Sequence, residues 1–370
     1  MSALDVFDRL REPLEGPNTI GNSRVFWIGF LVVLAVAVVY PVIVGSYQAG
    51  NTALFLLYAV LALSLSIVWG YTGVLSFGQV VFLGFAGYTF GIVSLNLGST
   101  LGVTAAIPIA VAIATLVAFV LGYFMFYGRV TGVFVAIITL VVTIVMETFM
   151  AQTAGSEWAI GEVKLGGFNG MPGIPNIALG VESAAVSFSG ELFYWLVLAV
   201  LVCSYLGLRV LINGRFGYAM VGVREDEDRV EMLGYDVRRV KLTVFTIGGA
   251  LAGVSGVLYA SWGNYVDPSV FSLTFATFPV VWVTVGGRES LLGAIIATVS
   301  IEWFRQQLSI TGSEYALVIV GLLLLGVVLL LPQGIVPYVH QKVLALWQGR
   351  EEATEDADRP PGGLLEEVLK

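Results

Sequence analysis

Residues 52–69 read TALFLLYAVLALSLSIVW, eighteen consecutive residues of which none is charged. They lie inside a longer run, from Val25 to Gly128, that contains no Asp, Glu, Lys or Arg. A soluble fold could not keep so long an uncharged run in water, whereas a helix that crosses a lipid bilayer needs about 20 mainly apolar residues. This stretch therefore predicts a membrane protein with several crossing helices.

The composition of the whole chain excludes several other classes. Of its 370 residues 57% are hydrophobic and 12% are charged, whereas soluble domains carry about 25% charged residues. This excludes a soluble globular protein and a disordered chain, and a net charge of -8 argues against binding to nucleic acid. Cys203 and His340 are the sole Cys and His, so neither an internal disulfide nor a Cys/His zinc site can form. We expect no cofactor and no metal.

Breaks at Gly, Asn, Pro and charged residues divide the apolar sequence into ten candidate crossings. They span residues 25–45, 52–69, 79–97, 104–127, 131–150, 191–212, 241–261, 275–287, 291–308 and 315–331. The runs are continuous, whereas the strands of a membrane barrel alternate over about ten residues. The sequence predicts an all-α polytopic membrane protein with about ten transmembrane helices, of which the eighth is short.

The basic residues predict the orientation, because short loops rich in Lys and Arg stay in the cytoplasm. If the N-terminus is inside, Arg129, the loop 213–241 and Arg288 all fall on the inner side. The irregular connection 151–190, rich in Gly, Pro and Asn, then falls outside. We expect a cytoplasmic lead, a transmembrane domain and an acidic cytoplasmic tail, over residues 1–24, 25–340 and 341–370. The chain would be a multi-pass protein of the inner or plasma membrane with both termini cytoplasmic.

The loop 213–241 is the most patterned polar segment. Its apolar residues recur at helical spacing between charged positions, namely Phe216, Met220, Val223, Val230 and Leu233. Asp226 suits a helix N-cap and Gly234 the residue after a helix end, which predicts a short helix that ends before Tyr235. Its narrow apolar stripe could dock into a groove of a soluble partner or lie on the membrane, and a solvated connector is the alternative.

A second segment, residues 69–79, reads WGYTGVLSFGQ between two apolar runs. Non-helical backbone at membrane depth is tolerated only where it is buried in protein or lines a wet cavity. A broken helix here could present carbonyl groups, Ser76 and Gln79 to a transported solute. An ordinary cytoplasmic turn is an equally weighted alternative.

Few ionisable residues fall inside the predicted crossings, and such residues are functional candidates by default. Glu302 and Arg305 are three apart and share a helix face, which favours mutual pairing; Glu147 has no evident role. Apart from Glu147, the crossings in the first half hold no acid or base that could form a proton relay, which disfavours a proton-driven carrier. No G-x-x-x-x-G-K-[ST] motif occurs, so another subunit would have to hydrolyse any ATP.

Several blocks in order carry a family resemblance. They are GYTGVLSFG at 70–78, GGFNG at 166–170, GRFG at 214–217 followed by REDE at 224–227, LGY at 233–235 and ALAGVSG at 250–256. From about residue 54 to 336 the chain resembles permease subunits of ATP-binding-cassette importers of the branched-chain amino acid class. This class comprises the LivM-like family and its urea-importing UrtC-like branch.

The resemblance implies a transport subunit that is not itself an enzyme. Its partners would be a second, usually different permease, two cytoplasmic ATPases and an external solute-binding protein. Residues 215–235 would be the coupling helix that seats in an ATPase cleft. The residues implied in that contact are Phe216, Met220, Val223, Arg224, Glu225, Glu227, Leu233 and Gly234. Those implied in the substrate pathway are Ser76, Gly78 and Gln79.

The amino-acid sequences of residues 228–230, 266–269 and 281–288 resemble the urea branch more than the LivM branch. A pathway with few fixed charges also suits a small neutral amide, so we expect urea or a short-chain amide, with branched-chain amino acids as the alternative. Gln79, where the family commonly has histidine, and Glu289 depart from the family pattern. A stand-alone channel or secondary carrier is the alternative of another class.

Overall fold

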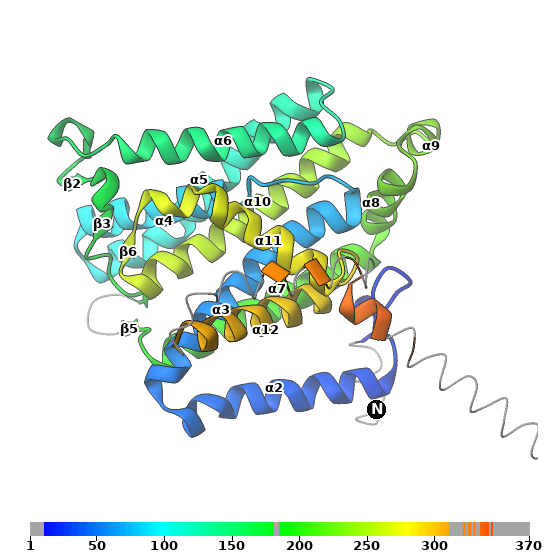
Figure 1. The fold of residues 1–370 in the computed structure, drawn as a ribbon, viewed down its shortest axis with the longest axis horizontal. Helices are drawn as coiled ribbons and strands as arrows, with labels where there is room; N and C mark the ends of the chain where they lie inside the picture. The colour runs from blue at the N-terminus through cyan, green and yellow to red at the C-terminus, as the bar shows by residue number, and fades with distance from the viewer. Residues whose placement is uncertain are drawn as a thin grey trace, which may run out of the picture.

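The computed structural model describes residues 11–180 and 185–310, together with residues 321, 322, 325, 326, 329, 334–339 and 342. It is built almost entirely of helices (Figure 1). The long helices are α2 (Arg24–Val44), α3 (Ser46–Leu65), α4 (Gln79–Leu97), α5 (Thr100–Tyr127), α6 (Val133–Ala151), α7 (Glu191–Asn213), α10 (Val237–Gly263), α11 (Leu273–Gly286) and α12 (Leu291–Ile310). Two short helices, α8 (Arg215–Glu225) and α9 (Glu227–Met232), lie between α7 and α10. The predicted all-α membrane fold is confirmed.

The number of crossings differs from the predicted ten. Among the described residues seven helices are long and apolar enough to cross a membrane, or eight if α11 and α12 form one span bent by 119°. Nine predicted segments coincide with helices, and the tenth, 315–331, lies largely outside the described residues. Counting 275–287 as a crossing of its own was wrong, because the 14 residues of α11 rise only about 21 Å.

Polar side chains and glycines set the helix boundaries. Ser99 and Ser272 accept hydrogen bonds from the backbone of the first turns of α5 and α11, which is the usual role of a serine N-cap. Gly98 ends α4 in the left-handed conformation, where glycine is favoured. The chain therefore reverses direction between α4 and α5 within three residues.

The core lies around α3, α4 and α10, and small residues let these helices approach closely. A Cβ added to Gly249 would lie 2.1 Å from Cβ of Ala118 on α5, and one on Gly256 would lie 2.1 Å from the carbonyl oxygen of Leu83 on α4. Such short approaches are common between membrane helices. By contrast, most side chains of α2 are exposed, and α2 and α6 lie at opposite edges of the bundle (Figure 1).

The two ends of the bundle are built differently (Figure 1). One end carries α8 and α9, and we call it the loop end. The other, the strand end, carries three antiparallel pairs of two-residue strands: β1 (Ala159–Ile160) with β2 (Val163–Lys164), β3 (Met171–Pro172) with β6 (Tyr265–Val266) and β4 (Ala178–Leu179) with β5 (Val186–Ser187). The β3–β6 pair joins the connection 151–190 to the segment after α10.

Candidate functional site

The loop 213–241 forms two helices and not the single helix expected over 215–235. Asp226 has an extended backbone, with φ -161° and ψ 100°. Its backbone N–H closes α8 on the carbonyl of Gly222, and its side chain accepts a hydrogen bond of 3.1 Å from the backbone N of Arg229, which starts α9. Gly234 follows α9 with φ +87°. The short helix that Asp226 and Gly234 predict is confirmed as α9, whereas the single helix that the resemblance implies over 215–235 is broken at Asp226.

The apolar stripe of this loop faces the chain's own bundle. Met220 is 0% exposed, Val223 and Val230 are also buried and Phe216 is partly buried, whereas Leu233 is 77% exposed. The apolar side chains that remain exposed on the loop are Tyr218, Met232, Leu233 and Tyr235. The apolar stripe that was expected to face a partner is therefore largely buried against this chain. Helical periodicity indicates that one face is buried, but it does not show whether that face packs on the same chain or on a partner.

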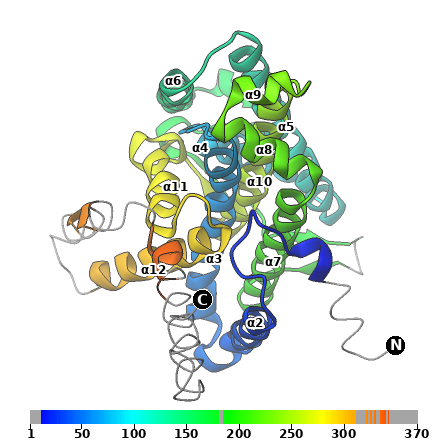
Figure 2. The ribbon, with the colours of Figure 1, turned by 90° about the vertical axis from the view of Figure 1, so that its right-hand side faces the viewer.

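Arg224 connects α8 to two other segments of the loop end. Its Nη1 donates a hydrogen bond of 2.8 Å to the carbonyl oxygen of Gly70 and lies 3.2 Å from Oε2 of Glu289. Its Nε and Nη2 bind Glu225 next to it. Glu289, which the sequence left without a role, thus pairs with a residue of the loop. Figure 2 views this end, with α8 and α9 in front.

The turn between α11 and α12 packs tightly against the end of α3, which finishes in a π-helix over Ser66–Gly70. A Cβ on Gly70 would lie 1.9 Å from the carbonyl oxygen of Arg288, so only glycine fits there. The hydroxyl of Tyr71 donates to the carbonyl of Glu289 at 3.1 Å.

A second ion pair fastens α9 to α10. Nζ of Lys241 lies 2.6 Å from Oε1 of Glu227, and the Lys241 side chain is 7% exposed. Of the three polar residues expected at a partner, Arg224 and Glu227 are therefore paired within the chain. Glu225 remains largely exposed while it holds Arg224.

The glycine-rich stretch is not an ordinary solvated turn. Its backbone is non-helical from Gly73 to Gly78, and Ser76 and Gly78 are buried. Oγ of Ser76 accepts from the backbone N of Gly78 at 3.0 Å, and the backbone N of Phe77 donates to Oγ1 of Thr139 on α6 at 3.1 Å. The stretch is thus a break between α3 and α4 that is buried against α6, the setting in which such backbone is tolerated at membrane depth.

Gln79, the first residue of α4, leaves part of its hydrogen-bonding capacity unused. The residue is 1% exposed, and its Oε1 accepts a hydrogen bond of 3.2 Å from Oγ of Ser64 on α3. Its Nε2 has no hydrogen-bond partner among the described residues. A buried donor in this state costs about 1–3 kcal/mol. The Nε2 group of Gln79 is therefore a buried donor that could still form hydrogen bonds with a solute.

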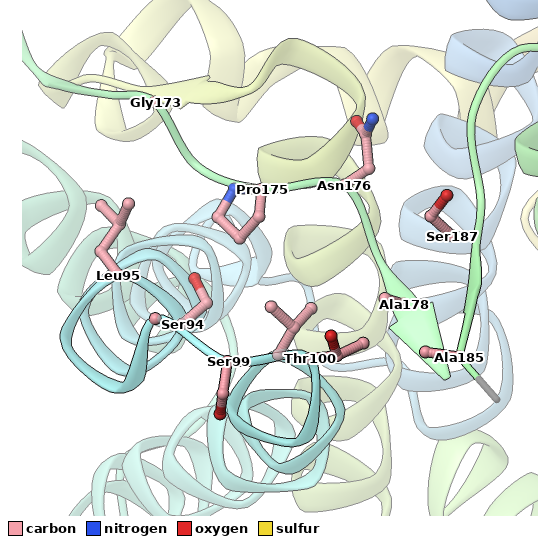
Figure 3. Close-up of a pocket in the computed structure, with 12 residues that line it drawn as sticks. Ser94, Leu95, Ser99, Thr100, Gly173, Pro175, Asn176, Ala178, Ala185 and Ser187 are labelled. Atoms are coloured by element: carbon pink, nitrogen blue, oxygen red, sulfur yellow. The ribbon is translucent and has the colours of Figure 1, made fainter. Parts of the chain in front are cut away.

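A pocket of about 540 Å³ opens at the strand end. Figure 3 shows Ser94 and Leu95 of α4 and Thr100 of α5 below the loop that carries Pro175 and Asn176. Its lining mixes polar residues such as Ser94 and Asn176 with apolar ones such as Leu95 and Val103, and none of the lining residues is charged. Nothing in the sequence pattern indicated it, because its walls come from segments about 80 residues apart.

Glu302 and Arg305, two further candidates inside the membrane, have structural partners. Nε of Arg305 donates to Oε2 of Glu302 at 3.0 Å, and Nε1 of Trp282 donates to the same carboxylate at 3.2 Å. The predicted pairing of Glu302 with Arg305 is confirmed. Within the described residues, no group of three or more His, Cys, Asp or Glu is placed to hold a metal ion. Arg209, which the sequence analysis did not single out, is buried at the loop end of α7.

Comparison with known proteins supports the resemblance. The profile of the family described as "Branched-chain amino acid transport system / permease component" matches residues 47–328. The chain belongs to this family. Family membership supports a transport subunit of the membrane rather than an enzyme, whereas the urea branch finds no support in the relatives below.

The relatives share part of their length with this chain. The high-affinity branched-chain amino acid permease LivM of Escherichia coli K12 is 32% identical over 154 residues, which is 40% of this chain and 35% of LivM. A probable LivM of Methanocaldococcus jannaschii is 26% identical over 187 residues, 47% of this chain and 53% of that protein. The chain thus spans about a third to a half of these relatives. No solved structure matches it.

Proposed function

We propose that this chain is the permease subunit of an ATP-driven importer of branched-chain or similarly hydrophobic amino acids. The family and the LivM relatives support this substrate class over urea. The observation that carries the proposal is the contact of Arg224 with Gly70 and Glu289, because it joins an exposed loop to a break between membrane helices.

The partners proposed are a second permease, two ATPases on the cytoplasmic side and an external binding protein. The ATPase would contact the exposed apolar residues Tyr218, Met232, Leu233 and Tyr235, with Glu225 beside them. Phe216, Met220 and Val223 would serve the same contact indirectly by holding α8 on the bundle. The loop end and both termini would be cytoplasmic, since Arg129, Arg215 and Arg288 gather there.

The proposed coupling is mechanical. Movement of an ATPase that grips α9 would be passed by Arg224 to the carbonyl of Gly70 and to the turn that Glu289 occupies. Because Gly70 ends α3 and the turn begins α12, both helices would shift together, as rigid-body rocking requires. Ser76, Gly78 and Gln79 are buried in this conformation, so they would meet a solute only in another one.

The direct test is reconstitution with the ATPases and the second permease. Leu233→Asp should abolish co-purification of the ATPase, while Leu179→Asp at the strand end, also an exposed leucine, should leave it intact. Vesicles with the full complex and the binding protein should take up leucine and not urea when supplied with ATP. Selective uptake by this chain alone, without ATP, would establish the channel or carrier instead.

A further inference from the structure

Arg209 is a buried charge with an unusually complete set of partners. It lies four residues before the end of α7 and is 1% exposed. Its five N–H groups face six neutral oxygen atoms at 2.9 to 3.2 Å, and three of these oxygens share the two N–H groups of Nη2. The acceptors are the carbonyls of Leu14, Ile20 and Gly21, the hydroxyls of Thr19 and Tyr205, and the side-chain oxygen of Asn22. All but Tyr205 belong to residues 14–22, which we call the strap.

Aromatic rings enclose the same guanidinium. Its central carbon lies 5.2 Å from the ring centre of Phe26 and 5.0 Å from that of Trp27, within the range of a cation–π contact. Nε1 of Trp27 donates to Oε1 of Glu15 in the strap at 2.7 Å. The site is therefore built from α7, the start of α2 and the strap together.

The strap is also tied to the last residues of α7, directly before α8. Nδ2 of Asn213 donates to the carbonyl of Leu14 at 2.9 Å and to Oγ1 of Thr19 at 3.0 Å. Nδ2 of Asn18 donates to the carbonyl of Ile212 at 3.1 Å. These bonds fix the corner at which α7 turns into α8.

The other side of the strap reaches the beginning of α12. Thr19 and Ile20 line a cavity of about 10 Å³ with Tyr71, Ser290 and Leu291, which is room for about one water molecule. The strap thus lies between the α7–α8 corner and the turn before α12. Arg224 holds the same turn from the α8 side through Glu289.

We propose that the strap, locked by Arg209, keeps the α7–α8 corner in fixed register with the α11–α12 turn, so that movement of α8 is passed to α12. Arg209 is in this role a positioning residue. If residues 14–22 were only a solvated N-terminal segment, they would need no buried guanidinium beside them. A rigid connection between two helices needs its backbone fixed at several points. The planar guanidinium of Arg209 fixes the strap in this way, because all of its N–H groups bind oxygen atoms. The proposal rests on the proposed function, because it assigns the strap a part in coupling.

The test uses the complete complex and measures ATPase co-purification, ATP hydrolysis and amino acid uptake in the same preparations. For Arg209→Met we expect normal co-purification, hydrolysis within twofold of the unmodified complex and uptake per ATP lowered at least tenfold. Arg129→Met, which removes an exposed arginine between α5 and α6, is the matched control and should change none of the three. Unchanged uptake per ATP in Arg209→Met would overturn the proposal.

A milder variant decides the question if Arg209→Met does not assemble. Thr19→Val keeps the shape of the side chain but removes the oxygen that Arg209 and Asn213 share. We expect uptake per ATP to fall about threefold with hydrolysis retained, and an unaltered ratio would reject the strap. Absence of the ATPase from the unmodified complex would instead reject the proposed function, and the strap's part in coupling with it.

Discussion

The guanidinium of Arg224 lies 2.8 Å from the carbonyl oxygen of Gly70, although 154 positions separate the two residues in the chain. A charge-assisted bond of this length is about twice as strong as a neutral one. It joins the loop between α7 and α10 to the point where α3 breaks. Each half of the contact is part of a separate sequence motif, and the structure makes them neighbours.

Replacement of Arg224 should separate binding of the ATPase from transport. Arg224→Met removes the bonds to Gly70 and Glu289, while the exposed residues of α9 stay in place. We expect the ATPase to co-purify as before and uptake to fall at least tenfold. Arg239→Met is the control, because Arg239 lies in the same loop but is exposed and, among the described residues, pairs only with nearby Asp236. Equal uptake by both variants would remove Arg224 from the coupling path.

Met220 and Leu233, grouped together by the sequence pattern, should respond differently to the same change. Met220→Asp places a carboxylate in a fully buried position, which costs several kcal/mol, so the purified subunit should lose thermal stability. Leu233→Asp changes an exposed residue and should leave the melting temperature within about 2 °C while releasing the ATPase. Thermal unfolding in detergent tests both, and equal melting temperatures would contradict the burial of Met220.

Removing Glu227 should reduce the stability of the protein more than removing its ion-pair partner Lys241. Glu227→Ala leaves a buried ammonium group without its partner, which we expect to cost about 1–3 kcal/mol. Lys241→Met leaves a carboxylate that solvent reaches, so the loss should stay below about 1 kcal/mol. Denaturation of the two variants under identical conditions measures the difference. A greater loss for Lys241→Met would show that the ammonium group does not depend on this pair.

Gln79→Leu should affect transport more than stability. The substitution removes a buried amide whose Nε2 has no described partner, and Ser64 still donates to the carbonyl of Leu61. We expect stability to be unchanged or raised by about 1 kcal/mol, with a clear loss of uptake and normal ATPase association. Gln48→Leu, at an exposed glutamine of α3, is the matched control. Full uptake by Gln79→Leu would exclude Gln79 from the substrate pathway.

A methyl group at residue 70 should disturb the turn between α11 and α12. Gly70→Ala would place its Cβ 1.9 Å from the carbonyl oxygen of Arg288, and overpacking of this kind costs about 1–3 kcal/mol. Gly207→Ala on α7 meets nothing within 4 Å and should be neutral or stabilising, since alanine favours a helix by up to about 1 kcal/mol. The melting temperature should fall for Gly70→Ala and stay unchanged or rise for Gly207→Ala.

The sequence was sufficient to locate the helices, but it did not show which segments pack against each helix face. Long, mainly apolar runs located α2 to α7 because lipid imposes a strict length and composition. The helix N-cap at Asp226 and the helix end at Gly234 were also predicted, because each depends on the residue itself and its neighbours in the chain. The count of crossings failed at α11, because its 14 residues are apolar but too few to cross a bilayer by themselves.

The candidate site depended on contacts that no local pattern records. Met220 and Leu233 share one helical periodicity, yet one packs inward and the other is exposed. No residue near Glu289 in the sequence indicated a role for it, and the structure places Arg224 beside its carboxylate. Arg209 gave no signal, because a single arginine near the end of an apolar run looks the same whether it reaches solvent or binds a distant segment.

The 119° bend between α11 and α12 has a geometric consequence. The 20 residues of α12 make an arm about 30 Å long, pivoted at the turn that Arg224 and Gly70 restrain. A tilt of about 10° at that pivot would carry the distal tip through about 5 Å on an arm of this length. A sub-ångström displacement beside the pivot could thus be magnified to roughly the width of an amino acid side chain.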